Sequence, residues 1–250
     1  MAEFIILSSL EKVFLDYTVP QCEYTRATIM KNEIFSYQIA YSFFSDDWRR
    51  KIDYTVTVVS PLSDCVTLRE VRNVPSEYPC ARPEGDDDIL RTTAGLYPDL
   101  LTPLAKDRIE CVKNAWHSMF VTVTPDCRYP AGEYPITVRF SSTEEVIEKT
   151  FTLEIINASL PEQELIFTNW FHADCIASVY GVRVFSEKHW SLIEKFMRSA
   201  HSGGVNMIFT PLFTPPLDTE IGAERLALIR FESFFIFHIS SAKWMQYVLS

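Results

Sequence analysis

Hydrophobic and polar positions alternate with a period of two over several short runs in the first part of the chain. Residues 52–59 alternate cleanly, and residues 34–41 do so more roughly. The runs are rich in β-branched and aromatic residues and are separated by turn formers such as Ser60 and Pro61. Alternation of this kind is typical of strands with one buried face. We therefore predict antiparallel β structure from the amino terminus to about Ile156.

Two neighbouring runs predict a hairpin, because residues 136–140 and 146–155 are joined by the short connection 141–144. A further strand is predicted over residues 119–124, and the turn formers that follow it end near Tyr134. Short strands at this spacing commonly form two sheets whose inner faces supply a shared core. The fold predicted for this region is an antiparallel β-sandwich.

An irregular insertion is predicted where the alternation is lost, over residues 74–88 and onward through 92–101. Its acidic run, Asp86 to Asp88, raises the possibility of a calcium site, since hard cations bind several oxygen ligands. The run lacks the alternating spacing of a calcium loop. We expect a turn that faces water, as short charge runs usually do.

The pattern changes after a polar stretch that includes Pro161 and predicts a linker between two domains, residues 1–158 and 159–250. In the second domain, residues 165–168 and 205–210 predict two strands. Between them, apolar residues recur at helical spacing over residues 187–202, with Ser186 placed to cap the helix and Gly203 to end it. The order strand, helix, strand predicts a βαβ unit with parallel strands.

Polar side chains follow the first of these strands, at the sheet edge where α/β folds gather ligand-binding groups. Asn169, Trp170, His172 and Asp174 occupy that position. An indole ring can cover the apolar face of a pyranose while amide, imidazole and carboxylate groups bind its hydroxyls. The alternative is that these side chains only pack or form hydrogen bonds that hold the strand ends together.

The loop after the second strand is fixed by prolines and adds Thr210 and Thr214, which we rank below His172 and Asp174 as ligand contacts. Rigid loops also occur for stability alone. A metal site at His172, Asp174 and Cys175 is not expected, because no second group of ligands such as H-x-x-x-H is present. The chain also has no G-x-S-x-G elbow, and a cysteine protease would rest on Cys175 beside His172 alone.

Composition narrows the class of protein further. An apolar fraction of 47% is that of a globular chain, and a formal net charge of -10 with dispersed Lys and Arg argues against a nucleic-acid partner. No run reaches membrane-spanning length, and Glu3 stands where a secretory signal needs positive charge. We expect a cytoplasmic protein with no cofactor, whose six scattered cysteines are reduced thiols.

Three stretches of the second domain, residues 169–177, 184–190 and 204–219, resemble the start of the catalytic barrel of glycoside hydrolase family 123, a former domain of unknown function. Residues 88–101 resemble its amino-terminal β-sandwich. The resemblance covers roughly the first 220 residues and is no longer visible beyond about Glu224. It implies a β-sandwich followed by a (β/α)8 barrel, and a glycan substrate with β-linked N-acetylgalactosamine.

The family resembles glycosidases in which the sugar's own 2-acetamido oxygen attacks the anomeric carbon. The resemblance implies that an aspartate orients the acetamido group and that an adjacent glutamate acts as acid and then base, with retention of configuration. No Asp-Glu dipeptide occurs in this chain, and a complete barrel takes roughly 200 residues or more. We therefore expect a truncated, inactive member with an incomplete barrel.

An atypical tail is predicted from about residue 225, which we attribute to a frameshift or a gene-prediction error. An uninterrupted reading frame with this tail in several related strains would contradict that origin. An open βαβ fragment leaves an unpaired sheet edge and apolar surface, which predicts poor solubility or association. The alternatives are a non-catalytic carbohydrate-binding or interaction module, or a purely structural sandwich.

Overall fold

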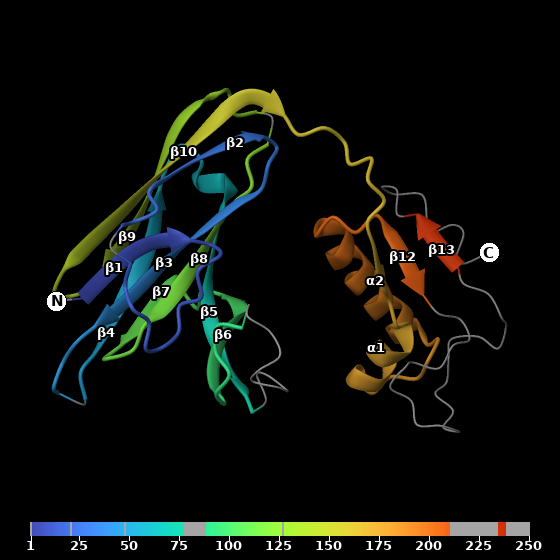
Figure 1. Ribbon diagram of the computed structural model, residues 1–250, viewed down its shortest axis with the longest axis horizontal. Coiled ribbons are helices and arrows are strands. Elements are labelled where there is room, and N and C mark those ends of the chain that lie inside the picture. Colours follow the sequence, from blue (N-terminus) through green and yellow to red (C-terminus); the bar gives the residue numbers. More distant parts are fainter. Residues whose placement is uncertain are drawn as a thin grey trace. The chain divides into compact units, whose positions relative to one another are not determined.

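The computed structural model describes residues 2–20, 22–47, 49–77, 89–126, 128–210 and 235–238, the last four and 209–210 by their backbone alone. The chain divides into two compact units, Met1–Pro161 and Glu162–Ser250, here called unit 1 and unit 2. Unit 1 is built from strands and unit 2 combines strands with helices (Figure 1). Among the residues described, no helix is both long and apolar enough to cross a membrane.

Unit 1 contains two sheets of five strands each. The first, sheet A, has the order β1-β3-β8-β5-β6, and all of its pairs are antiparallel. Its strands are β1 Ala2–Ser8, β3 Phe35–Phe43, β8 His117–Val123, β5 Val66–Ser76 and β6 Gly95–Pro103. The second, sheet B, has the order β2-β10-β9-β4-β7. Its strands are β2 Arg26–Lys31, β10 Val146–Ser159, β9 Gly132–Ser141, β4 Lys51–Val59 and β7 Arg108–Val112.

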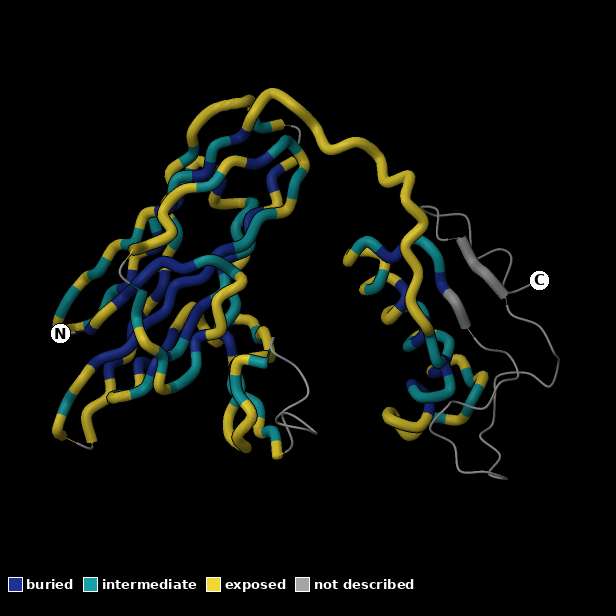
Figure 2. The backbone as a smooth tube through the Cα atoms, viewed as in Figure 1, coloured by how far each residue is buried: buried dark blue, intermediate teal, exposed yellow. Residues whose placement is uncertain are grey.

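The two sheets share one hydrophobic core, to which the inward-facing residues of both contribute. Tyr37 of sheet A stacks on Phe151 of sheet B with ring centroids 4.3 Å apart, and Phe4 lies 4.4 Å from Phe140. Buried positions concentrate along the middles of these strands (Figure 2). Aromatic pairs at such distances stabilise the packing beyond the area they bury. The predicted β-rich first part of the chain is confirmed.

One strand pair departs from the antiparallel prediction, because β2 runs parallel to β10. The chain leaves β1 in sheet A and enters sheet B at β2, so β2 pairs with a strand more than a hundred residues away in sequence. Local alternation of side chains reports which face of a strand is buried. It carries no information about the direction of a distant partner.

A second departure is β6, most of which lies in the stretch predicted as an irregular insertion, which ends at residue 101. β6 is an edge strand that pairs with β5 through a register shift after Arg72. Most of its residues are exposed on both faces, so the sequence shows no alternation there. The acidic run Asp86 to Asp88 lies outside the described residues.

The outer face of sheet A is partly covered by the segment that follows β1. Val13, Tyr17 and Val19 of this segment pack on Ile5 and other residues of the sheet. β3 is consequently buried on both faces from Tyr37 to its end, rather than on alternate residues. This burial explains why the alternation of residues 34–41 is only approximate.

Unit 2 contains a three-stranded sheet with the order β11-β12-β13 and two helices. The strands are β11 Thr168–Trp170, β12 Met207–Thr210 and β13 Phe235–His238, and the helices are α1 Ala173–Tyr180 and α2 Glu187–Ser202. β11 and β12 are parallel, as the predicted crossover requires. β13 lies in the tail predicted to be atypical and pairs with β12 antiparallel, an arrangement that a parallel barrel does not use.

Helix α2 has the predicted bounds, and the Ser186 side chain caps it by accepting a hydrogen bond from the backbone of His189. Helix α1 was not predicted, and the crossover therefore holds two helices rather than one. His172 occupies its N-cap position without a side-chain cap bond, so the usual start signal is missing. Gly181, with a φ of 60°, ends it in the left-handed conformation.

Candidate functional site

The candidate sugar contacts lie on β11 and the first turn of α1. β11 begins at Thr168, later than the predicted strand, and therefore Asn169 and Trp170 lie in the strand rather than beyond it. They pair with Ile208 and Phe209 of β12. Because strand side chains alternate, Asn169 and Trp170 project to opposite faces of the sheet. The predicted position beyond the strand end is thus wrong for Asn169 and Trp170, while their role as sugar contacts stays a prediction.

Side-chain amides explain the late start of β11. The Asn206 amide accepts a hydrogen bond from the Phe167 N–H at 2.8 Å and donates one to the Leu165 carbonyl at 2.9 Å. Gln163 donates to the carbonyls of Leu165 and Gly204, both at 3.0 Å. These bonds satisfy backbone groups of residues 165–167 that a strand ladder would otherwise use.

Trp170 and His172 form the one ring contact among the candidate residues. Their rings stack with centroids 6.1 Å apart and an interplanar angle of 16°. Trp170 is 61% exposed and His172 is partly buried, so much of the indole is accessible to solvent. A surface of this kind can cover the apolar face of a sugar ring, with His172 holding the indole in place.

Asp174 lies in the first turn of α1 and is partly buried. The positive end of a helix dipole favours a carboxylate at this position. Within the described residues, neither Asp174 nor Asn169 makes a side-chain hydrogen bond, so both polar groups are available to a ligand. Thr214, the remaining candidate, lies outside the described residues.

His189 is the residue that sequence reasoning missed. Its side chain is fully buried, its Nε2 lies 2.8 Å from the Ala173 carbonyl, and its Nδ1 accepts from the Phe185 N–H at 3.0 Å. A carbonyl only accepts and a backbone N–H only donates, so the ring is neutral with its proton on Nε2. The bond to Ala173 fixes the first turn of α1 on α2. The available signal was its spacing, since His189 falls on the stripe of Ile193 and Met197.

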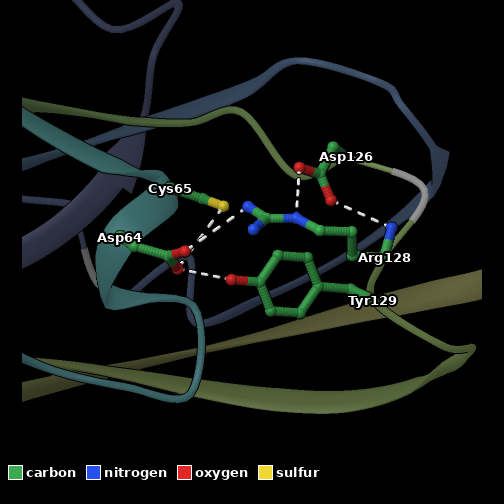
Figure 3. Close-up of polar contacts among 5 residues, drawn as sticks. All are labelled: Asp64, Cys65, Asp126, Arg128 and Tyr129. Atoms are coloured by element: carbon green, nitrogen blue, oxygen red, sulfur yellow. Dashed lines mark hydrogen bonds and ion pairs between the residues drawn. The ribbon is translucent and has the colours of Figure 1, made fainter.

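A second cluster of polar side chains lies on the surface of unit 1 (Figure 3). Asp64 accepts hydrogen bonds from the Tyr129 hydroxyl and the Cys65 thiol, and Arg128 pairs with Asp126 at 2.6 Å and with Asp64 at 3.5 Å. The Tyr129 bond lowers the pKa of Asp64, and the carboxylate raises the pKa of Tyr129. Both pKa values are thus shifted away from the near-neutral range in which general acid–base catalysts work. This cluster joins the turn before β5 to the turn after β8.

Neither a metal nor a disulfide site emerges from the described ranges. No three His, Cys, Asp or Glu side chains among those residues gather as a metal ion requires. The described cysteines, Cys22, Cys65, Cys111 and Cys175, are free thiols. Burial, with a smaller effect of Glu145, raises the pKa of Cys111 to about 12, which makes that thiol unreactive at neutral pH.

One family model matches the second part of the chain. Residues 170–242 match the family model "Glycoside hydrolase 123, catalytic domain". The resemblance to this family is therefore confirmed, and it extends past Glu224, where the sequence alone was expected to lose it. The matched segment contains Trp170, His172 and Asp174. No curated protein matches the chain by sequence.

Among solved structures, a family 123 glycoside hydrolase from Clostridium perfringens, studied for glycolipid glycan hydrolysis, aligns with a TM-score of 0.65 and 14% identity. The alignment covers 82% of this chain, more than either unit makes up, and only 37% of that protein's length. The TM-score establishes a shared fold, and an identity this low establishes nothing beyond the fold.

Two further matches have lower scores. The N-terminal domain of PorA has a TM-score of 0.29 at 8% identity, covering 63% of this chain and 100% of its own. The CooA pilin subunit from enterotoxigenic Escherichia coli has a TM-score of 0.29 at 10% identity, covering 63% of this chain and 99% of its own. Neither score is high enough to support an inference about this protein.

Proposed function

We propose that the chain is a glycoside-hydrolase-like protein that binds a glycan through unit 2 but does not hydrolyse it. In this proposal residues 1–158 are the β-sandwich domain of the family and residues 159–250 are the beginning of its (β/α)8 barrel. The observation that carries the proposal is the stacked pair of the exposed Trp170 and the partly buried His172, which lies in the segment that matches the catalytic-domain model.

The roles of the individual residues follow from their positions. Trp170 covers the apolar face of a sugar ring, and His172 keeps the indole in its plane. Asp174 at the start of α1 accepts hydrogen bonds from sugar hydroxyls. Asn169 and Thr214 are the further substrate contacts of the proposal. The ligand we propose is a glycan with β-linked N-acetylgalactosamine, met in the cytoplasm, without a metal or a cofactor.

Loss of hydrolysis is proposed because the chemistry needs two adjacent carboxyl groups. Substrate assistance replaces the nucleophile, but an aspartate must still hold the acetamido group and a glutamate must protonate the leaving oxygen. The 250 residues contain no Asp-Glu dipeptide. With neither group in place, the acceleration that acid catalysis supplies, about 10²-fold or more, is missing.

Binding is tested with N-acetylgalactosamine and the full chain, by saturation-transfer NMR. We expect transfer to the sugar ring protons from the wild type and from Tyr180→Ala, which removes an exposed aromatic side chain at the far end of α1. Trp170→Ala should reduce it. Equal transfer with and without the Trp170 ring would refute the proposed contact.

Loss of catalysis is tested with a chromogenic N-acetyl-β-galactosaminide. We expect no chromophore above the rate of the uncatalysed reaction, at any pH at which the chain is folded. Release that rises in proportion to protein concentration would contradict this part of the proposal and leave the binding part intact.

The second candidate function is that of a non-catalytic carbohydrate-binding or interaction module whose working part is the sandwich of unit 1. The observation that favours it is a polar cavity in that unit. Binding of sugar that is indifferent to Trp170 would favour this candidate over the first.

A further inference from the structure

Unit 1 contains a cavity of about 480 Å³ at the edge of its two sheets, a volume within the range of ligand sites. β5 and β7 supply most of its walls, together with β4, β8 and the turn before β7. The lining residues are Asp53, Glu70, Val71, Arg72, Asn73, Ala105, Arg108, Ile109, Glu110, Val112 and His117. Four of these side chains are apolar and the others can form hydrogen bonds.

Charged and polar side chains stand here at core-facing positions. On β5, Val66 and Leu68 pack against the core, and the next positions of the same parity are Glu70 and Arg72. On β8, Met119 is buried in the core, and two residues before it stands His117. Glu70 and His117 at these positions depart from the binary pattern of their strands, whereas the Arg72 side chain is 57% exposed. Such departures concentrate at functional sites.

The polar groups of the cavity include both hydrogen-bond donors and hydrogen-bond acceptors. The Glu70 side chain is only 14% exposed and its carboxylate pairs with Arg72 at 2.9 Å. Burial raises the pKa of Glu70, Arg72 opposes this effect, and Glu110 adds to it. Burial, with a smaller effect of Arg72, lowers the pKa of His117, which is therefore mainly neutral at neutral pH. A neutral imidazole has one donor and one acceptor.

Packing holds the imidazole of His117 in place. Its ring stacks on Tyr41 of β3 with centroids 6.1 Å apart and an interplanar angle of 26°. The Tyr41 side chain is fully buried. An imidazole supported on a rigid ring keeps its donor and acceptor in fixed directions, which lowers the entropy cost of binding a ligand.

The mixture of groups selects a class of ligand. An inorganic anion is opposed by the carboxylates of Asp53 and Glu70, and a cation by the guanidinium groups of Arg72 and Arg108, while the Glu110 carboxylate is paired with Lys51 at 2.9 Å. A metal ion has no set of three ligands within the described residues. Hydroxyl groups both donate and accept, and a sugar ring also presents C–H faces to apolar walls.

We propose that this cavity binds an uncharged saccharide unit, whose hydroxyls contact Glu70, Arg72 and His117 while its C–H faces lie against Ala105 and Ile109. This site is separate in sequence from the aromatic pair on β11 and α1 and does not depend on it. A saccharide bound here would make the sandwich a ligand-binding domain in its own right.

The test uses the full chain and saturation-transfer NMR with four probes: glucose, galactose, N-acetylgalactosamine and inorganic phosphate, the last followed by calorimetry. We expect at least one of the sugars to bind. Glu70→Gln should lower the affinity for that sugar about tenfold, which is the effect of losing one hydrogen bond to a charged group. Glu148→Gln is the matched control, because Glu148 also pairs with an arginine, Arg139, at 2.7 Å, but on the exposed face of sheet B. It should leave the affinity unchanged.

Each outcome decides for or against the cavity. Sugar binding that survives Trp170→Ala and falls with Glu70→Gln supports it, even if the proposed site in unit 2 fails. Binding that is lost with Trp170→Ala and unaffected by Glu70→Gln overturns it, as does the absence of binding by all three sugars or a preference for phosphate. Should Glu70→Gln not fold, Arg72→Met and His117→Gln must show the same loss for the proposal to stand.

Discussion

At the scale of single residues, three buried tyrosines in unit 1 differ in what their hydroxyls contact. The Tyr54 hydroxyl donates to the Glu145 carboxylate at 2.6 Å. The hydroxyls of Tyr37 and Tyr41 have no hydrogen-bond partner in the described part of the chain. Burial raises the pKa of all three phenols, so all remain protonated through the neutral range. Ionisation of the phenols therefore plays no part when the unfolding free energies of their Tyr→Phe variants are compared, and the hydrogen bond of the hydroxyl can be tested directly.

We predict that Tyr54→Phe lowers the free energy of unfolding by about 1–2 kcal/mol, because Glu145 loses its donor. Tyr37→Phe should be neutral or slightly stabilising, since it removes a buried hydroxyl that nothing satisfies. Urea denaturation of both variants measures the contrast. Equal destabilisation by the two substitutions would show that the bond to Glu145 adds nothing.

His117 makes the stability of unit 1 depend on pH. Its pKa in the folded chain is lowered, chiefly by burial, below the value of about 6.5 that an unfolded histidine has. The unfolded state therefore binds more protons in the window between these two values. The contribution of neutral His117 is present above the unfolded pKa and is lost as the pH falls through the folded pKa.

We expect the unfolding free energy of the wild type to fall from about pH 7 to about pH 5 more steeply than that of His117→Gln, the difference being at most about 1.4 kcal/mol per pH unit. Denaturant titrations at a series of pH values give the slopes. Parallel curves for wild type and His117→Gln would contradict the prediction.

At the scale of elements, the sequence predicts what is encoded locally. Helix α2 has its cap, its apolar stripe and its terminating glycine within one stretch, and its bounds are as predicted. The hairpin of β9 and β10 is likewise confirmed, with Val146 opposite Ser141. Both elements form their hydrogen bonds with neighbours in sequence, and side-chain periodicity is enough to reveal them.

The elements that the sequence did not predict depend on distant partners. β6 is an exposed edge strand, α1 has no capping side chain, and β2 takes its direction from β10. The same limit affects the candidate site. Asn169 and Trp170 were expected beyond the strand end, but they lie in β11, which starts later than predicted where Asn206, far along the chain, bonds to the backbone at Phe167.

The packing of α1 on α2 depends on His189, which links the Phe185 N–H to the Ala173 carbonyl. We predict that His189→Ala removes the hydrogen bonds to both groups, leaves a cavity at a fully buried position, and lowers the local stability of the helices by about 2 kcal/mol or more. Hydrogen exchange of the backbone amides in residues 173–202 measures this loss. His201→Ala, at the exposed end of α2, should leave the exchange rates unchanged. Unaltered protection in His189→Ala would mean that apolar contacts alone hold the helices.

At the scale of the whole molecule, each unit has a core of its own. The clusters around Tyr37 and Trp116 draw all their members from residues before Pro161, and the cluster around Ile193 draws all of its members from residues after it. The segment from Ile156 to Trp170 is exposed throughout. Folding of unit 1 therefore requires no side chain from unit 2.

We predict that a chain ending at Pro161 folds alone, with a β-type circular dichroism spectrum and a single cooperative melting transition. Every strand of sheets A and B and both of the hydrophobic clusters of unit 1 lie within it. The full chain should show the same transition at the same temperature, because the core of unit 1 is unchanged by the residues that follow. A shortened chain that melts without cooperativity, or at a clearly lower temperature, would show that unit 2 contributes to the stability of the sandwich.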